Sequence, residues 1–158
     1  MVSQYFGYDK KKVIQALRYH FITRREIKVM IVLINVFAIA SAALFFFRLV
    51  SPLAFLISSM LWIALMITFW FWLPRMIYRK AQTFQDRFQC ILTNDEFRIE
   101  NEKGGRSWEW PEFSTWMESP HFFHLYFNPR SFFIVPKEAF PGEELQEARN
   151  ILNAKIPK

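Results

Sequence analysis

The sequence has one cysteine and three histidines among its 158 residues, which limits the chemistry it can carry. A single thiol, Cys90, excludes an intramolecular disulfide framework and a zinc site built from several cysteines. Its setting in RFQCIL predicts a core or half-buried strand position rather than a reactive thiol. His121 and His124 differ by an odd number, so on a strand they point to opposite faces, which disfavours a metal pair.

Motifs for nucleophilic catalysis and phosphate binding are also missing. The sequence contains no GxSxG elbow, and the KGG stretch at residues 103–105 lacks Walker or Rossmann spacing. The carboxylates Glu109, Glu112 and Glu118 are scattered, as is typical of a solvated surface. We therefore expect no enzymatic activity, no cofactor and no metal site.

Charge is absent from two long stretches, residues 29–47 (VMIVLINVFAIASAALFFF) and residues 53–73 (LAFLISSMLWIALMITFWFWL). As helices, each would span roughly 30 Å, the thickness of the hydrocarbon core of a bilayer. Residues 48–52 (RLVSP) predict a tight turn, so residues 29–73 are expected to form an antiparallel transmembrane helical hairpin. A signal peptide is disfavoured because the charged lead is long and a second apolar run follows at once.

The positive charges lie on either side of this hairpin, and the turn holds Arg48 alone. The positive-inside rule then places both termini in the cytoplasm. The same cations are expected to contact anionic lipid; they are Lys10, Lys11, Lys12, Arg24, Arg25, Lys28, Arg75, Arg79 and Lys80. The net charge of +6 is thereby explained, and nucleic acid is not an expected partner because the part after Arg87 is roughly balanced.

Within the hairpin, small residues recur at a spacing that allows close helix packing. Ala38 with Ala42, and Ala54 with Ser58, have the small-xxx-small spacing. Ordinary lipid-facing composition explains the same pattern equally well. Asn35 is the strongly polar residue of the first span, and we expect its amide to bond to the partner helix rather than to line a conduction path.

Residues 1–28 and 74–158 are expected to form the cytoplasmic part. The segment VSQYFGY predicts a strand, and Asp9 an N-cap for an amphipathic helix whose apolar stripe suits either the membrane surface or a sheet. Pro111, Pro120, Pro129 and Pro136 exclude a continuous helix from residues 108–140 and favour short antiparallel strands. Six strands and an amphipathic C-terminal helix are predicted after the spans.

The strands are rich in aromatic residues, which suit a small core. In an extended chain, however, the adjacent pairs Phe122–Phe123 and Phe132–Phe133 must each turn one ring outward. We therefore expect an exposed apolar face that packs on the membrane, on the N-terminal helix or on another subunit. Its candidate interface residues are Phe122, Phe123, Phe132, Phe133 and Trp116.

The segments WEWPEF, FHLYF and FFIVPKEAF resemble the C-terminal signature of the YcxB-like proteins, small bacterial membrane proteins with two spans. The most specific matching positions are Trp110, Phe123, Tyr126, Ile134, Pro136, Lys137 and Phe140. The resemblance implies a pleckstrin-homology-like (PH-like) antiparallel β-barrel or sheet with a C-terminal capping helix, and location in the bacterial inner membrane. It implies no catalytic residue.

These observations predict a non-enzymatic, membrane-anchored interaction module. Its cytoplasmic domain would lie at the inner leaflet, contact lipid, and bind a protein partner or a second copy of itself. Two alternatives remain open from the sequence: an accessory subunit of a membrane transporter or channel, and an immunity-type protein.

Overall fold

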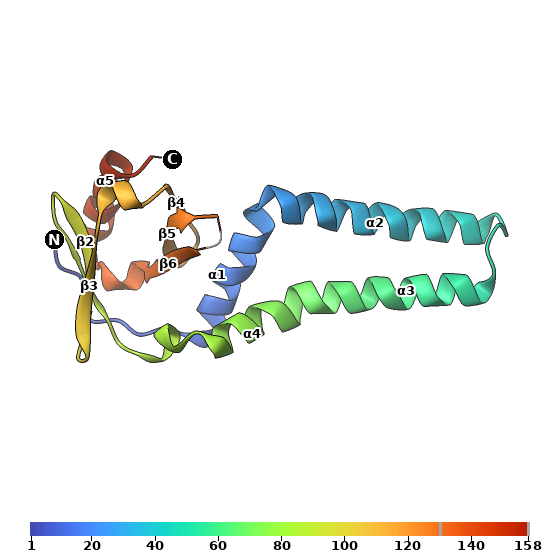
Figure 1. The fold of residues 1–158 in the computed structure, drawn as a ribbon, viewed down its shortest axis with the longest axis horizontal. Helices are drawn as coiled ribbons and strands as arrows, with labels where there is room; N and C mark the ends of the chain where they lie inside the picture. Colours follow the sequence, from blue (N-terminus) through green and yellow to red (C-terminus); the bar gives the residue numbers. More distant parts are fainter. Residues whose placement is uncertain (130, 158) are drawn as a thin grey trace. The chain divides into compact units, whose positions relative to one another are not determined.

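The computed structural model describes residues 1–129 and 131–157 and divides into two compact units (Figure 1). One unit comprises residues 1–16 and the chain from residue 81 onward, and the other comprises residues 17–80. The first boundary falls inside helix α1 (Lys10–Thr23). We refer to the two parts as the sheet unit and the hairpin unit.

The hairpin unit consists mainly of two long apolar helices, as the sequence predicts. The first is α2 (Arg25–Phe46); the second runs from α3 (Pro52–Ile67) through a π-helical turn, η1 (Thr68–Trp72), into α4 (Leu73–Lys80). Both are long and apolar enough to cross a membrane, and none of the residues in their most apolar windows is buried.

The turn between α2 and α3 is a Schellman motif. The N–H of Leu49 donates to the carbonyl of Leu44 at 2.9 Å, and that of Arg48 donates to Phe45 at 3.0 Å. Arg48 is left-handed, with φ of 56°. Ser51 then caps α3 by accepting from the first turn. The predicted tight turn is confirmed.

Within residues 81–129 and 131–157, the sheet unit has the six strands that the sequence predicts, in two separate antiparallel sheets. The first sheet has the order β1-β2-β3 and the second β4-β5-β6. The strands are β1 (Gln89–Leu92), β2 (Glu96–Asn101), β3 (Gly104–Glu109), β4 (Thr115–Glu118), β5 (Phe122–Asn128) and β6 (Ser131–Pro136); short 3₁₀ turns are η2 (Gln82–Gln85), η3 (Trp110–Glu112) and η4 (Lys137–Ala139).

These strands do not close into a barrel in the part of the chain that the structure describes. Pro111 lies in η3, directly after β3, where it ends that strand. Glu109 and Glu112 form a capping box around this turn. The chain therefore leaves the first sheet and starts the second, instead of pairing β3 with β4.

The N-terminal segment adds to the edge of β1, but as isolated bridges rather than the continuous strand predicted. Val2 pairs with Ile91, and Phe6 with Phe88. The predicted N-cap is confirmed, because Asp9 accepts from the N–H of Lys12 at 2.9 Å.

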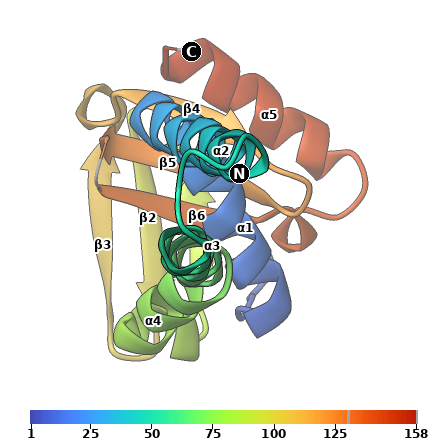
Figure 2. The ribbon, with the colours of Figure 1, turned by 90° about the vertical axis from the view of Figure 1, so that its right-hand side faces the viewer.

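One core lies between the two sheets, whose strands cross (Figure 2). The first sheet contributes Phe97 and Cys90, and the second contributes Phe123 and Leu125. The C-terminal helix α5 (Glu144–Lys155) covers an end of this core with its buried apolar side chains. Aromatic rings fill most of the space, with centroid separations down to 4.8 Å for Phe113 and Phe127.

The second sheet is also covered on the face turned away from this core, so the outward aromatic face packs within the chain, against the segment that leads into the N-terminal helix, rather than being left open. Five consecutive residues of β5 are buried, beginning with Phe122, which is 2% exposed, and Phe123, which is 1% exposed. The Tyr8 ring stacks on Phe122 at 6.5 Å, and its hydroxyl donates to the carbonyl of Ile134 at 2.8 Å. One ring of the pair does turn away from the core, but the N-terminal segment meets it.

An ion cluster joins β4 to the C-terminal part of the sheet unit. Arg149 on α5 binds the carboxylate of Glu118 with two contacts, Nε to Oε2 at 3.0 Å and Nη2 to Oε1 at 2.8 Å. Lys137 approaches the same carboxylate. The hydrogen bonds from Arg149, together with Lys137, lower the pKa of Glu118 to about 2.

Replacing Phe123 by alanine should destabilise the sheet unit by about 3–5 kcal/mol, because the lost ring would leave a cavity in the core between the two sheets. Phe132→Ala is the matched control, since Phe132 is only half-buried, and it should cost less than half as much. Near-UV circular dichroism of the full chain in micelles during denaturant unfolding measures both. Equal losses for the two variants would contradict the assignment of Phe123 to the core.

The Glu118 cluster should also make stability depend on pH. Because the folded-state pKa lies below the ordinary carboxyl value, the cluster stabilises at neutral pH, and this contribution is lost as pH falls from about 5 toward 2. We expect Glu118→Gln to lower the free energy of unfolding at pH 7 by only about 1 kcal/mol, because the carboxylate is partly solvated. The variant should also lose less stability than the parent protein as the pH falls. The midpoint temperature of thermal unfolding, measured at several pH values between 2 and 7 for both proteins, tests this expectation. Glu147→Gln, at an exposed position on α5, is the control and should leave the pH dependence intact.

Candidate functional site

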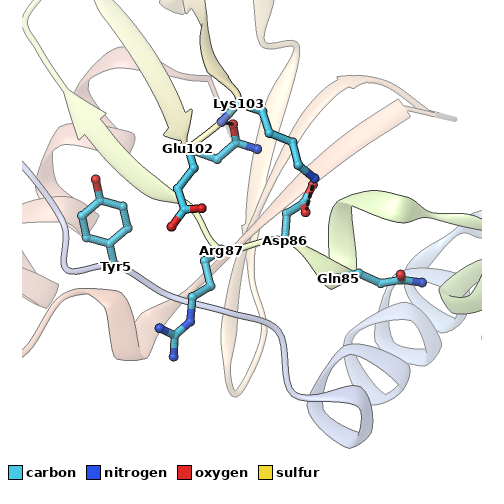
Figure 3. Close-up of a pocket in the computed structure, with 7 residues that line it drawn as sticks. Tyr5, Gln85, Asp86, Arg87, Glu102 and Lys103 are labelled. Atoms are coloured by element: carbon cyan, nitrogen blue, oxygen red, sulfur yellow. Dashed lines mark hydrogen bonds and ion pairs between the residues drawn. The ribbon is translucent and has the colours of Figure 1, made fainter.

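A polar depression of about 440 Å³ lies on the sheet unit (Figure 3). Three separate segments form it: the N-terminal segment, the stretch between η2 and β1, and the turn between β2 and β3. Its lining residues are Tyr5, Gln85, Asp86, Arg87, Asn101, Glu102 and Lys103. Two features bring these residues together: the N-terminal segment pairs with the edge of the sheet, and β2 and β3 form a hairpin.

The turn between β2 and β3 has a precise geometry. Gly104 has φ of 142°, a conformation that favours glycine. The Asn101 side chain accepts from the N–H of Lys103 at 2.9 Å. A Cβ on Gly105 would lie 3.2 Å from the carbonyl oxygen of Ile99, so this second glycine lets the two strands approach closely. The two glycines therefore allow β2 and β3 to form a tight hairpin.

Charges of both signs line the depression. Lys103 binds Asp86 at 2.8 Å, and this hydrogen bond raises the pKa of the Lys103 ammonium. Arg87 and Glu102 are exposed and form no ion pair with any residue that the structure describes. The Tyr5 side chain is 65% exposed. Such a surface can recognise a polar peptide segment by complementary charge and hydrogen bonds.

The predicted core position of Cys90 is confirmed, because the residue is fully buried. Burial raises the pKa of its thiol. His124 is buried as well, rather than on the sheet surface, and its Nε2 lies 2.9 Å from the hydroxyl of Ser119. Within residues 1–129 and 131–157, no group of three or more His, Cys, Asp and Glu side chains is arranged to hold a metal ion.

The predicted interface aromatics are mostly internal. Trp116, Phe122 and Phe123 are buried and are therefore not available to a partner. Phe132 and Phe133 are half-buried. Phe133 packs on the core, 6.4 Å from the Phe97 ring, whereas Phe132 lies beside Tyr126 on the opposite face, with centroids 5.3 Å apart.

The predicted lipid-contacting cations differ in their partners. Lys12 forms an ion pair with Glu138 in the sheet unit, whereas Lys10 and Lys11 are exposed. In the hairpin unit, none of the predicted cations pairs with a carboxylate among the described residues; they are Arg24, Arg25, Lys28, Arg75, Arg79 and Lys80. These six remain available to an external anion.

Only some of the residues predicted to pack the two helices of the hairpin together lie in the contact between them. Ser58 lies in the contact, where its hydroxyl is 2.7 Å from that of Ser41 on the other helix. Ala38 is half-buried, but Ala42 and Ala54 are exposed. Asn35 donates to the carbonyl of Ile31 at 2.8 Å, so its amide bonds within its own helix and the predicted bond to the partner helix is wrong.

The depression of Figure 3 is the feature that sequence reasoning missed. Its residues come from three segments, and none of them belongs to a motif. The glycines of KGG indicate a turn, which forms one side of the depression. The other sides depend on the pairing of residues 1–6 beside β1, which the sequence does not reveal.

Comparison with known proteins identifies the larger part of the sheet unit. No curated protein and no solved structure gives a significant match to the chain. Residues 92–152, which run from the end of β1 into α5, match the family model described as YcxB-like protein. The resemblance expected from the sequence is therefore confirmed over these residues.

Proposed function

We propose that the protein is a two-span, membrane-anchored interaction module that presents its YcxB-like domain at the cytoplasmic face of the bacterial inner membrane. The observation that carries the proposal is the surface of the two apolar helices. Large apolar side chains along α2 and α3 are exposed, for example Ile39 at 70% and Leu53 at 66%. A helix that is apolar on all sides requires an apolar surrounding, and the helix lengths suit a bilayer.

The orientation with both termini in the cytoplasm follows from the distribution of cations around the hairpin. The six cations without ion pairs stand just before α2, in its first turn, or on α4, and a single arginine, Arg48, occupies the turn between α2 and α3. They would lie beside anionic headgroups, each contributing at most about 1 kcal/mol.

The sheet unit supports a PH-like interpretation of the domain. Two antiparallel sheets cross over one core, a C-terminal helix covers that core, and the N-terminal segment pairs with β1 as a seventh element. The hairpin unit is thus inserted between the first and second elements of the domain.

The partner of this module is a protein, or a second copy of the chain, which binds at the depression of Figure 3. Arg87 and Glu102 supply opposite charges there, and Tyr5 supplies an exposed ring. Tyrosine and arginine are enriched among residues that anchor interfaces. The buried rings of β5 maintain the fold and do not take part in this contact.

The topology is tested with a reporter enzyme that is active only outside the cytoplasm. Fused after Lys158, it should stay silent, whereas the same reporter inserted in the turn at residues 48–52 should be active. Activity at the C-terminus with an inactive turn fusion would reverse the orientation.

The partner surface is tested by purifying the complex in native lipid and measuring its mass with every co-purifying protein identified. Arg87→Glu should weaken the complex about tenfold, because it places a like charge against the partner's acidic group. Lys155→Glu makes the same change of charge at an exposed position on α5, and it should leave the complex intact. A complex that survives Arg87→Glu unchanged would place the interface elsewhere.

A further inference from the structure

The second span changes its helical form where the apolar run ends. Residues Thr68–Trp72 form a π-helical turn, closed by the N–H of Leu73 bonding to the carbonyl of Thr68. Turns of this kind inside α-helices are frequent at functional sites. This one has the sequence TFWFW and is therefore crowded with rings.

Pro74 explains why a backbone carbonyl is left over at this turn. In an α-helix, the carbonyl of Trp70 would accept from the N–H of residue 74, but proline has no N–H. The guanidinium of Arg18 on α1 replaces it, with Nε donating to the Trp70 oxygen at 2.9 Å. A side chain thus completes the backbone hydrogen bonding of the span.

The same guanidinium also lies against two rings. Its central carbon is 5.5 Å from the ring centroid of Trp70 and 5.5 Å from that of Phe71. Only Nε is used by the carbonyl, so among the described residues the two Nη groups of Arg18 have no hydrogen-bond acceptor. Arg18 is therefore held in place while most of its donors remain free.

A second guanidinium meets the same ring. Arg75, one turn after Phe71, has its central carbon 5.7 Å from the Phe71 centroid. Neither arginine pairs with a carboxylate in the described chain, and Glu26 is the one acidic residue in residues 17–80. Two like charges gathered at one ring repel each other, and a bound anion removes that repulsion.

We propose that Arg18 and Arg75, held against the rings of Trp70 and Phe71, bind the phosphate of an anionic phospholipid headgroup. This proposal rests on the membrane placement argued above and specifies one lipid site within it. The π-helical turn lies at the end of the apolar run, where hydrocarbon gives way to headgroups. Guanidinium groups suit phosphate because their planar donors can bind two oxygens at once.

The experiment uses the full chain in nanodiscs of phosphatidylcholine with or without phosphatidylglycerol. Native mass spectrometry counts the anionic lipids that stay bound as lipid is progressively removed. Arg18→Lys and Arg75→Lys keep the charge but lose the planar donors, and each should weaken retention of phosphatidylglycerol about tenfold. Arg106→Lys is the matched control, because the Arg106 guanidinium also lies over a ring, 5.1 Å from the centroid of Trp108, but on β3 of the sheet unit. It should retain lipid like the parent protein.

Equal retention by the parent and both site variants would overturn the proposal, as would an equal loss in Arg106→Lys, since the loss would then not depend on where the guanidinium stands. Arg75 makes no bond to the Trp70 carbonyl, so its variant tests the site even if Arg18→Lys disturbs α1. Displacement of phosphatidylglycerol by free inorganic phosphate would overturn the assignment to a lipid.

Failure of the membrane placement has a different signature. If the parent protein is released from vesicles by alkaline carbonate, both the placement and the lipid site are wrong. If it stays embedded while the site variants bind lipid normally, the lipid site alone is wrong.

Discussion

No side chain of α2 or α3 is fully buried within the protein, and the organisation of the hairpin unit follows from that constraint. In hydrocarbon, polar groups must find partners inside the protein. The Asn35 amide bonds to Ile31, and the Thr68 hydroxyl bonds to the carbonyl of Ala64 at 2.8 Å. Ser41 and Ser58 bond to each other across the two helices. These amide and hydroxyl groups, which would oppose insertion into a membrane, are thus paired within the hairpin unit.

The sequence was sufficient for features that depend on local composition. Two uncharged runs of membrane length predicted α2 and α3, and the segment RFQCIL predicted the strand position of Cys90, which lies buried in β1. Asp9 as an N-cap and Gly104 in the hairpin are determined by the backbone conformation within a few residues. In each case, short-range physics outweighs tertiary context.

The aromatic strands show where such reasoning fails. Periodicity correctly places Phe122 and Phe123 on opposite faces, but it does not reveal whether a second layer covers the outer face. Here Tyr8, more than a hundred positions away in sequence, stacks on Phe122. The division into two sheets has a related cause, because Pro111 signals an interruption without telling where the next strand will pair. The depression lined by Tyr5 and Arg87 depends on the same long-range pairing.

The ends of the second span show how local irregularity determines where that span can function. At one end, Arg48 adopts a left-handed conformation to close the Schellman turn, which satisfies carbonyls of α2 within the loop itself. At the other, Pro74 has no N–H to give the Trp70 carbonyl its usual i+4 hydrogen bond, and Arg18 donates to that carbonyl. A charged guanidinium in that role is incompatible with the middle of a bilayer but suits its boundary. Under the proposed membrane placement, two arginines and their rings lie at headgroup depth, and the stretch FWFWLPR contains the rings, the proline and Arg75 of this arrangement.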